Sequence, residues 1–472
     1  MSHILSNNNN YLTIHTCVEK CKLNLNNYEY PFSRACSKGH LSIAQWLLTI
    51  NPNINISAGN EYAFSHACAN GHLLIAQWLL TINPNINISA DKEYAFSHAC
   101  ANGHLLIAQW LLTINPNINI STEDGYAFSC TCANGHLLIA QWLLTINPNI
   151  NISTDSNYAF SRACANGHMV IAKWLLTINP NINISTDSNY AFSRACGKGY
   201  LLIAQWLLTI NPNINISTDN EYAFTRACGN GHLLIAQWLL TINPNINISA
   251  DNEYAFTHSC ANGHLLIAQW LLTINPNINI SADNEYAFRN SCTKGHLLIA
   301  QWLLTINPNI NISASNEYAF THSCANGHLS IAQWLLSIKP IINISADSEY
   351  AFKYACLKEN IEIVKWLYKI NWNIKSNADD EFAFKIACVN GYIENAKHIY
   401  NINWDINISA DDEFIFKNVC ANGHLSIAQW LLTINPNINI SAGNAYAFSH
   451  ACANGHLQIA QWLLTINSNL EC

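Results

Sequence analysis

The chain has 472 residues, of which 50% are hydrophobic and only 11% are charged. Its formal net charge of −8 argues against a generally basic nucleic-acid-binding protein. No apolar run approaches the roughly 18 residues that a membrane-spanning helix needs, and the segment after Met1 lacks the basic and apolar regions of a secretion signal. We therefore expect a protein that neither spans a membrane nor is secreted.

A cysteine that recurs at a constant interval of 32 residues indicates that the chain is built from repeats. These cysteines are Cys36, Cys68, Cys100, Cys132, Cys164, Cys196, Cys228, Cys260, Cys292, Cys324, Cys356, Cys388, Cys420 and Cys452. Such a period is typical of a solenoid or a propeller rather than of separate globular domains. We predict 14 repeats over residues 30–472, the last of them truncated, preceded by a degenerate repeat or cap over residues 1–29.

The repeat at residues 62–93 illustrates the elements expected in every copy. Apolar residues within 63–68 have helical spacing, and Gly71 follows where a helix would end in the left-handed region. Residues 74–82 predict a second helix, apolar on nearly all sides, which the neighbouring repeats would have to cover. Pro84 stops this helix, and an extended turn with a polar tip at residues 91–93 leads into the next repeat.

This plan of helix, tight turn, helix and protruding turn resembles the ankyrin-repeat family. The segment Y-A-F-S-H-A-C stands where the family has T-P-L-H-x-A-A, and A-N-G-H-L-L-I-A-Q-W-L-L is similar to its N-G-H-L-E-I-V-K-L-L-L. The resemblance covers residues 30–472 and implies an all-α ankyrin-repeat solenoid of stacked helix-turn-helix units. The asparagine-rich copies are most similar to the ankyrin proteins of giant DNA viruses.

The turns depart from the family pattern. The repeat has 32 rather than 33 residues, Asn83 replaces a glycine, and the proline and histidine of the T-P-L-H segment are absent. In the family that histidine forms hydrogen bonds between neighbouring turns. We therefore expect residues such as Ser65 or Thr225 to supply weaker ones.

The cysteine ladder is interpreted as core packing. Equivalent residues of adjacent repeats should lie one helix layer, about 8–10 Å, apart, whereas a disulfide needs Cα atoms within about 7 Å. One cysteine per repeat also lacks the paired spacing of a zinc site. We therefore predict no metal and no cofactor, and the 18 cysteines favour a reducing intracellular compartment such as the cytoplasm.

Two further ladders are also interpreted as structural. The histidine after the turn glycine is replaced by Tyr200, Asn360 and Tyr392 in three repeats. These replacements are incompatible with a metal-binding or catalytic role. We therefore expect this histidine to stabilise its own turn. The tryptophan of the second helix could stack on nucleic-acid bases, but it lacks the basic groove that accompanies such stacking. We expect this tryptophan to pack in the core or on the back face.

The sequence contains no signature of an enzyme. It has no glycine-rich phosphate loop and no hydrolase or metalloprotease motif. Carboxylates concentrate in the turn tips, where we expect them to be exposed and solvated: Asp91, Glu93, Asp219, Glu221, Asp251 and Glu253. We predict a non-catalytic protein.

The two positions after the phenylalanine of the first helix vary among the copies, whereas the second helix hardly does. In the ankyrin family the first helix and the turn tips line the concave, partner-facing side, so the resemblance implies a binding face here. The variable positions include Tyr354 and a cationic or protonatable band made of Arg34, His66, His98, Arg162, Arg194, Arg226, His258, His322 and His450. We expect this band to bind an extended segment of another protein, of mixed polarity. The alternative is that these positions vary merely because they are exposed.

Residues 339–417 form a second irregularity. Nine of the sixteen lysines lie there together with twelve acidic residues, and Trp372 and Trp404 replace the proline of the loop. Exposed tryptophan is enriched at binding hot spots. These repeats are therefore either a specialised partner site or older copies that escaped duplication.

The end of the array raises a question of capping. Solenoids need terminal repeats with a polar outer face, yet residues 462–464 repeat the internal apolar pattern. Either the last repeat frays or another chain covers it, which would allow end-to-end self-association.

We predict an interaction scaffold for other proteins, with two alternatives left open. A substrate adaptor of a ubiquitin ligase would need a recruitment segment beside the repeats. The family resemblance also implies that Asn87 and Asn119 match the position modified by asparaginyl hydroxylases, so the chain could be their substrate or a decoy.

Overall fold

The structure, a computed structural model, describes residues 28–150, 152, 158–180, 182, 184–358, 360–370, 377–402 and 406–468. Every regular element in these ranges is an α-helix, as the sequence predicts. No helix in the described ranges is long and apolar enough to cross a bilayer. The predicted cap over residues 1–29 falls almost wholly outside the described residues, since only Tyr28 and Glu29 of it are placed.

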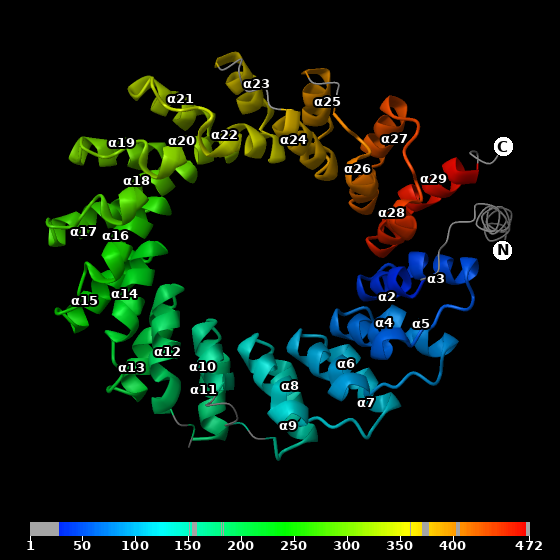
Figure 1. The fold of residues 1–472 in the computed structure, drawn as a ribbon. Coiled ribbons are helices and arrows are strands. Elements are labelled where there is room, and N and C mark those ends of the chain that lie inside the picture. Colours follow the sequence, from blue (N-terminus) through cyan, green and yellow to red (C-terminus); the bar gives the residue numbers. More distant parts are fainter. Residues whose placement is uncertain are drawn as a thin grey trace, which may run out of the picture. The chain divides into compact units, whose positions relative to one another are not determined.

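Each repeat contributes one pair of helices (Figure 1). The first helices are α2 (Glu29–Ser37), α4 (Ala58–Ala69), α6 (Ala90–Ala101), α8 (Thr122–Ala133), α10 (Tyr158–Ala165), α12 (Ile184–Gly197), α14 (Thr218–Gly229), α16 (Ala250–Ala261), α18 (Ala282–Thr293), α20 (Ala314–Ala325), α22 (Ala346–Leu357), α24 (Asn377–Val389), α26 (Ala410–Ala421) and α28 (Ala442–Ala453). The second helices are α3 (Leu41–Ile50), α5 (Leu73–Ile82), α7 (Leu105–Ile114), α9 (Leu137–Ile146), α11 (Met169–Ile178), α13 (Leu201–Ile210), α15 (Leu233–Ile242), α17 (Leu265–Ile274), α19 (Leu297–Ile306), α21 (Leu329–Ile338), α23 (Ile361–Ile370), α25 (Ile393–Ile402), α27 (Leu425–Ile434) and α29 (Leu457–Ser468).

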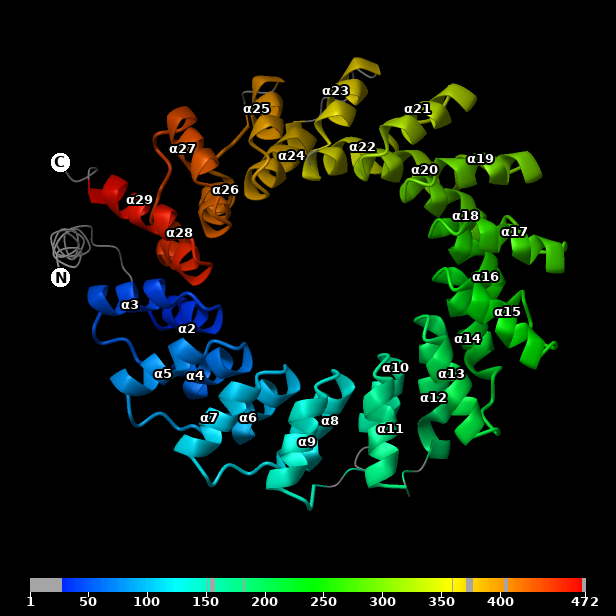
Figure 2. The same cartoon turned by 180° about the vertical axis from the view of Figure 1, so that it is seen from behind.

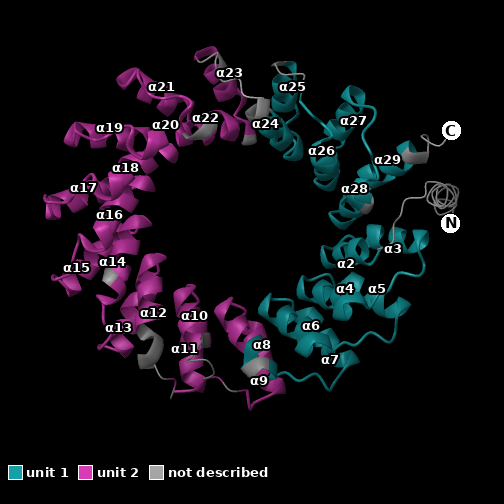
Figure 3. Ribbon diagram, in the orientation of Figure 1, with its two compact units in different colours: residues 1–127, 380–472 teal, residues 128–379 magenta. Residues whose placement is uncertain are grey.

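The chain divides into two compact units, which Figure 3 shows in different colours. Unit 1 comprises residues 1–127 and 380–472, and unit 2 comprises residues 128–379. Within each unit the first helices of successive repeats pack side by side, as α14 does on α16 in unit 2 and α26 on α28 in unit 1. The second helices stand further apart and project from this row (Figure 1 and Figure 2). The first-helix row is therefore the concave side of each unit.

The second helix is covered on one side only, contrary to our expectation. Ile75, Ala76 and Leu79 of α5 are buried, but Leu74 of the same helix is 72% exposed. The equivalent leucines of other repeats, such as Leu234, are exposed in the same way. The reason is the wider spacing of the second helices, which leaves only the face toward the first-helix row in contact with neighbours.

The turn before many of the first helices has an unusual backbone. In α6, Asp91, Lys92 and Glu93 have φ values of 51°, 53° and 63°, so three successive residues lie in the left-handed region before right-handed helix begins. That conformation costs roughly 1–2 kcal/mol for each residue with a side chain. Two hydrogen bonds offset part of this cost: the Glu93 N–H donates to the Ser89 carbonyl (3.3 Å), and a Glu93 carboxylate oxygen accepts the N–H of Asn119 (3.3 Å).

Asparagine replaces the family's histidine as the link between neighbouring turns. The Asn83 side-chain amide donates to the hydroxyl of Ser57 in the preceding repeat (3.1 Å). The expectation for Thr225 is wrong, since its hydroxyl donates to the Glu221 carbonyl one helical turn earlier (3.0 Å). The buried hydroxyl of Ser65 has no hydrogen-bond partner among the described residues.

Within unit 1, the first repeat packs against the last. Helix α2 lies beside α28, and the rings of Trp46 and Phe448 are 5.9 Å apart. Consecutive repeats pack through the same pair of residue types, as Phe32 and Trp78 do at 6.1 Å. The first repeat therefore packs on the last one through the same tryptophan–phenylalanine contact that joins consecutive repeats.

Two polar contacts repeat this relation. Lys38 Nζ donates to the side-chain oxygen of Asn454 (2.6 Å), as Lys294 does to Asn262 of the preceding repeat (2.6 Å). The His40 imidazole also lies against the turn at Gly455. The apolar end of the last repeat, which we expected either to fray or to meet another chain, is thus covered by the first repeat of the same chain.

Candidate functional site

The predicted cationic band lies along the first-helix row, and each member of it meets a tyrosine of the next repeat. In unit 1, an Arg34 N–H donates to the Tyr62 hydroxyl (2.5 Å). His66 stacks between Tyr62 and Tyr94, at 3.7 and 4.7 Å between ring centroids. His98 continues the stack from Tyr94 at 3.8 Å. The alternation is one tyrosine and one arginine or histidine per repeat.

The same stack crosses the contact between the first and last repeats. His450 of α28 stacks on Tyr446 at 3.7 Å and lies 5.2 Å from the ring of Tyr30 in α2. We call the whole row the unit 1 column, which consists of Tyr446, His450, Tyr30, Arg34, Tyr62, His66, Tyr94, His98 and Tyr126.

Unit 2 contains a column richer in arginine. The guanidinium carbon of Arg194 lies 5.4 Å from the ring centre of Tyr190 and 5.0 Å from that of Tyr222. Arg226 lies 5.2 Å from Tyr222 and 4.1 Å from Tyr254. Such distances are typical of cation–π contacts. The row, which we call the unit 2 column, consists of Arg162, Tyr190, Arg194, Tyr222, Arg226, Tyr254, His258 and Tyr286.

The remaining predicted positions of unit 2 form a shorter stack. His322 lies 3.6 Å from Tyr318 and 4.2 Å from Tyr350, and Tyr350 stacks on Tyr354 at 4.0 Å. The tyrosines are the residues that sequence reasoning missed. Their signal was present, because a tyrosine recurs four residues before almost every variable position.

Three histidines of the columns, His66, His258 and His450, lie in surroundings that disfavour their protonated form. Burial lowers the pKa of His66 and His450. Burial, and then the charge of Arg226, lowers the pKa of His258 to about 4. These imidazoles are therefore neutral at pH 7. Arg34 behaves oppositely, since its hydrogen bond to Tyr62 raises the pKa of the guanidinium.

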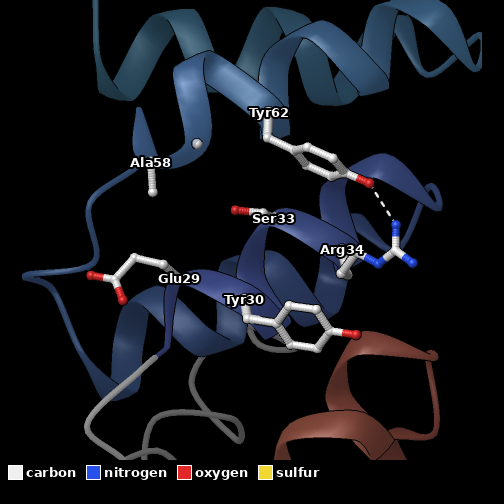
Figure 4. A pocket seen from close by; sticks show the side chains of 7 residues that line it. Glu29, Tyr30, Ser33, Arg34, Ala58 and Tyr62 are labelled. Atoms are coloured by element: carbon white, nitrogen blue, oxygen red, sulfur yellow. Dashed lines mark hydrogen bonds between the residues drawn. The ribbon is translucent and has the colours of Figure 1, made fainter.

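A pocket of about 350 Å³ lies beside the unit 1 column, between α2 and α4. Glu29, Tyr30 and Ser33 line it from α2, and Ala58, Gly59 and Tyr62 line it from α4, together with Arg34. Figure 4 shows the Arg34–Tyr62 hydrogen bond at one edge and the Glu29 carboxylate at another. The pocket thus offers an apolar floor between a cation and an anion.

The prediction that the carboxylates of the turn tips are solvated is wrong for Glu93 and Glu221, whereas Glu253 is half-buried. Asp91 is exposed, but Glu93 is only 7% exposed because its side chain turns inward to accept the Asn119 N–H. Glu221 is buried in the same way and accepts the N–H of Asn247 (3.3 Å). The glutamate is therefore a link between repeats rather than part of a surface charge.

The three ladders have structural roles. Cys68 and its equivalents are buried free thiols, and burial raises the pKa of Cys68, so the ladder packs as neutral thiol. The tryptophans pack on the phenylalanine of the preceding repeat, as expected for core packing. The histidine also acts between repeats rather than within its own turn. A Cβ placed on Gly71 would lie 2.7 Å from Cε1 of His104 in the next repeat.

Four of the lysines of residues 339–417, namely Lys365, Lys385, Lys397 and Lys417, lie beside acidic side chains. Lys385 Nζ lies 2.5 Å from a carboxylate oxygen of Asp411, and Lys417 Nζ lies 2.8 Å from one of Asp412. The charge of these four lysines is therefore partly neutralised locally. Trp372 and Trp404 lie outside the described residues, so their predicted role stays a prediction.

Comparison with known proteins identifies the family. A family model described as ankyrin repeats (three copies) matches residues 2–90, 64–154, 96–186, 127–220, 192–284, 256–350, 285–380 and 322–412. The chain therefore belongs to the ankyrin-repeat family, whose members are in general protein–protein interaction modules. No curated protein matches the chain. The similarity to proteins of giant DNA viruses stays a prediction from composition.

Proposed function

We propose that the chain is a non-catalytic scaffold that binds other proteins along its first-helix row. The observation that carries this proposal is the pair of columns, which place one aromatic and one variable side chain per repeat at a constant register. Tyrosine and arginine are the residues that dominate binding energy at protein interfaces. Stacking restrains these side chains before binding, which lowers the entropy lost on association.

Affinity purification of the full chain from the cells that express it tests this function. One variant replaces Arg162, Arg194 and Arg226 with glutamine, and a second has residues 339–417 rewritten to the common repeat. We expect proteins that the wild-type chain enriches and the arginine variant loses, while the rewritten chain keeps them. Loss only from the rewritten chain would move the site to the divergent repeats and to Trp372 or Trp404. No enriched protein in any sample would contradict the scaffold function.

Binding partners are proposed to be proteins of a reducing compartment. The ladder thiols, such as Cys68, are buried and free, and an oxidising environment would select against so many of them. Self-association through the last repeat would compete with the first repeat of the same chain for one surface. The ligase-adaptor alternative needs a recruitment segment, and residues 1–27 lie outside the described residues, so it stays a prediction.

A second candidate function is modification by an asparaginyl hydroxylase. Asn87 and Asn119 both lie on the exposed part of the protruding turn, where an enzyme can reach them. The Asn87 side-chain oxygen accepts the Ser89 N–H (3.2 Å), a contact that the enzyme would have to open. Intact-mass measurement after co-expression with such an enzyme tests this, and no gain of an oxygen would dismiss it.

A further inference from the structure

The contact between the first and last repeats of unit 1 uses the same residue pairs as the contact between consecutive repeats. The rings of His450 and Tyr30 lie 5.2 Å apart across it, as those of His98 and Tyr126 do between α6 and α8. The tryptophan–phenylalanine contact and the lysine–asparagine hydrogen bond described above also recur there. The outer face of the first repeat is therefore complementary to the outer face of the last one.

The last repeat lacks one group that links consecutive repeats elsewhere. In several repeats the glutamate before the first helix accepts a backbone N–H of the next turn, as Glu413 accepts that of Asn439 (3.0 Å). The last repeat has Ala445 at this position, and an alanine side chain has no acceptor atom. No connecting turn joins α28 to α2 either, because the two helices lie at opposite ends of the sequence. This contact is therefore easier to separate than the contact between consecutive repeats.

The two faces that meet are different surfaces. One is formed by α2 and α3, which carry Tyr30, Lys38 and Trp46, and the other by α28. Every chain has one face of each kind, so the first repeat of one chain can pack on the last repeat of another through the same residues. Contacts of this head-to-tail kind join identical subunits into rings or filaments. Within one chain the contact costs no translational freedom, so it is favoured at low protein concentration.

We propose that the outer face of the first repeat binds the outer face of the last repeat of a second copy of the chain, in exchange for the contact within one chain. The residues that carry the association are Tyr30, Lys38 and Trp46 on one copy and Phe448, His450 and Asn454 on the other. The occupant is a second copy rather than an unrelated protein, because the face on α28 already fits the first repeat of this sequence. Chains joined in this way would present several copies of the first-helix row.

Two variants of the full chain, each of which loses one face, test the proposal. Trp46→Ala alters the first repeat and Phe448→Ala alters the last, so neither variant can close on itself or bind another copy of the same variant. Each should therefore sediment as a monomer. An equimolar mixture contains one intact face of each kind, so its average mass at sedimentation equilibrium should rise toward about twofold that of either variant. It should rise no further, because the heterodimer has only altered faces left.

A second pair of variants avoids changes to buried rings. Tyr30→Ala with Lys38→Ala alters exposed side chains of the first repeat. His450→Ala with Asn454→Lys alters half-buried side chains of the last repeat and places a lysine opposite Lys38. Lysine already occupies the position of Asn454 in other repeats, for example at Lys294, so the repeat should still fold. The mixture of this pair should associate in the same way.

Hydrogen exchange verifies that each variant alone has opened the contact. Exchange should accelerate in α28 and stay at the wild-type rate in α16, an internal helix that shows whether the array is folded. Mixtures that remain monomeric with both pairs would overturn the proposal. So would a contact that stays closed in all four variants, because the exchange of partners requires it to separate. Association of a single variant with itself would also overturn it, since another surface would then be responsible.

This inference does not depend on the proposed scaffold function. The variants of the first and last repeats leave Arg162, Arg194 and Arg226 unchanged, and the arginine variant leaves the terminal repeats unchanged. Loss of other proteins in the purification experiment and loss of association between copies are therefore separate results, and either can fail without the other.

Discussion

At the scale of single residues, the buried glutamate found in many of the turns is the least expected feature. Glu93 accepts a backbone N–H of the next repeat with one carboxylate oxygen, while the other has no partner among the described residues. Only the accepting oxygen contributes a hydrogen bond. The side chain is therefore required as an acceptor rather than as a charge.

This difference leads to a prediction about Glu93. Glu93→Ala should leave the Asn119 N–H without a partner and reduce local stability by about 1–2 kcal/mol, whereas Glu93→Gln keeps an acceptor oxygen and should change stability by less than about 0.5 kcal/mol. Hydrogen exchange of the peptide containing Asn119 measures both effects. Asp91→Ala, at an exposed carboxylate of the same turn, is the control. Equal acceleration by Gln and Ala would show that charge matters instead.

At the scale of elements, the junction between the two helices depends on a neighbouring repeat. Gly263 has a φ of 91° and lies against His296, with 2.7 Å between Cε1 of that imidazole and a Cβ built on the glycine. The sequence predicts a glycine at this turn from the end of the first helix. The sequence does not show that His296 of the next repeat also requires a glycine at position 263, because the two residues are 33 positions apart.

We expect Gly263→Ala to destabilise its region of the array by about 2 kcal/mol or more, since the left-handed backbone alone costs about 1–2 kcal/mol. Gly229→Ala is the matched control, because this glycine lies at the end of α14, where α4, α6 and α16 have alanine. An added Cβ would lie 3.1 Å from Cβ of His258, a tight contact but in right-handed backbone, so we expect Gly229→Ala to cost clearly less than Gly263→Ala. Hydrogen exchange resolved by repeat distinguishes the two variants, and equal effects would contradict the role of His296.

At the scale of the whole molecule, the first and last repeats stabilise each other. Trp46→Ala should therefore increase hydrogen exchange in α28 and α29 as well as in α2 and α3, because Phe448 loses its partner. Trp270→Ala removes the same side chain from an internal repeat and should affect only α14 to α17, around its contact with Phe224. Unchanged exchange in α28 after Trp46→Ala would show that the terminal repeats are independent.

The free energy of unfolding should also depend on pH, because buried histidines occur in many repeats. Burial lowers the pKa of His40, His136, His232, His258 and several equivalents below the ordinary value of 6.5. The unfolded chain therefore takes up protons before the folded one does. The full stability is present above pH 6.5 and is lost as the pH falls toward 4, the folded pKa of His258.

Thermal melting between pH 7 and pH 5 measures this dependence while most carboxylates remain ionised. We expect the melting temperature to fall over this range and His258→Gln to reduce the fall. A melting temperature that does not change between these pH values would contradict neutral burial of the histidines.

The sequence by itself determined the repeat length, the helix pairs, the all-α solenoid and the family. Hydrophobic periodicity, glycine and proline act within about 30 residues, and 14 copies repeat the same local signals. It also identified the variable positions of the first helix. Only the tertiary structure revealed the tyrosines between them, the inward glutamates and the packing of Trp46 on Phe448. These contacts join different repeats, and their geometry depends on how helices stack rather than on any single helix.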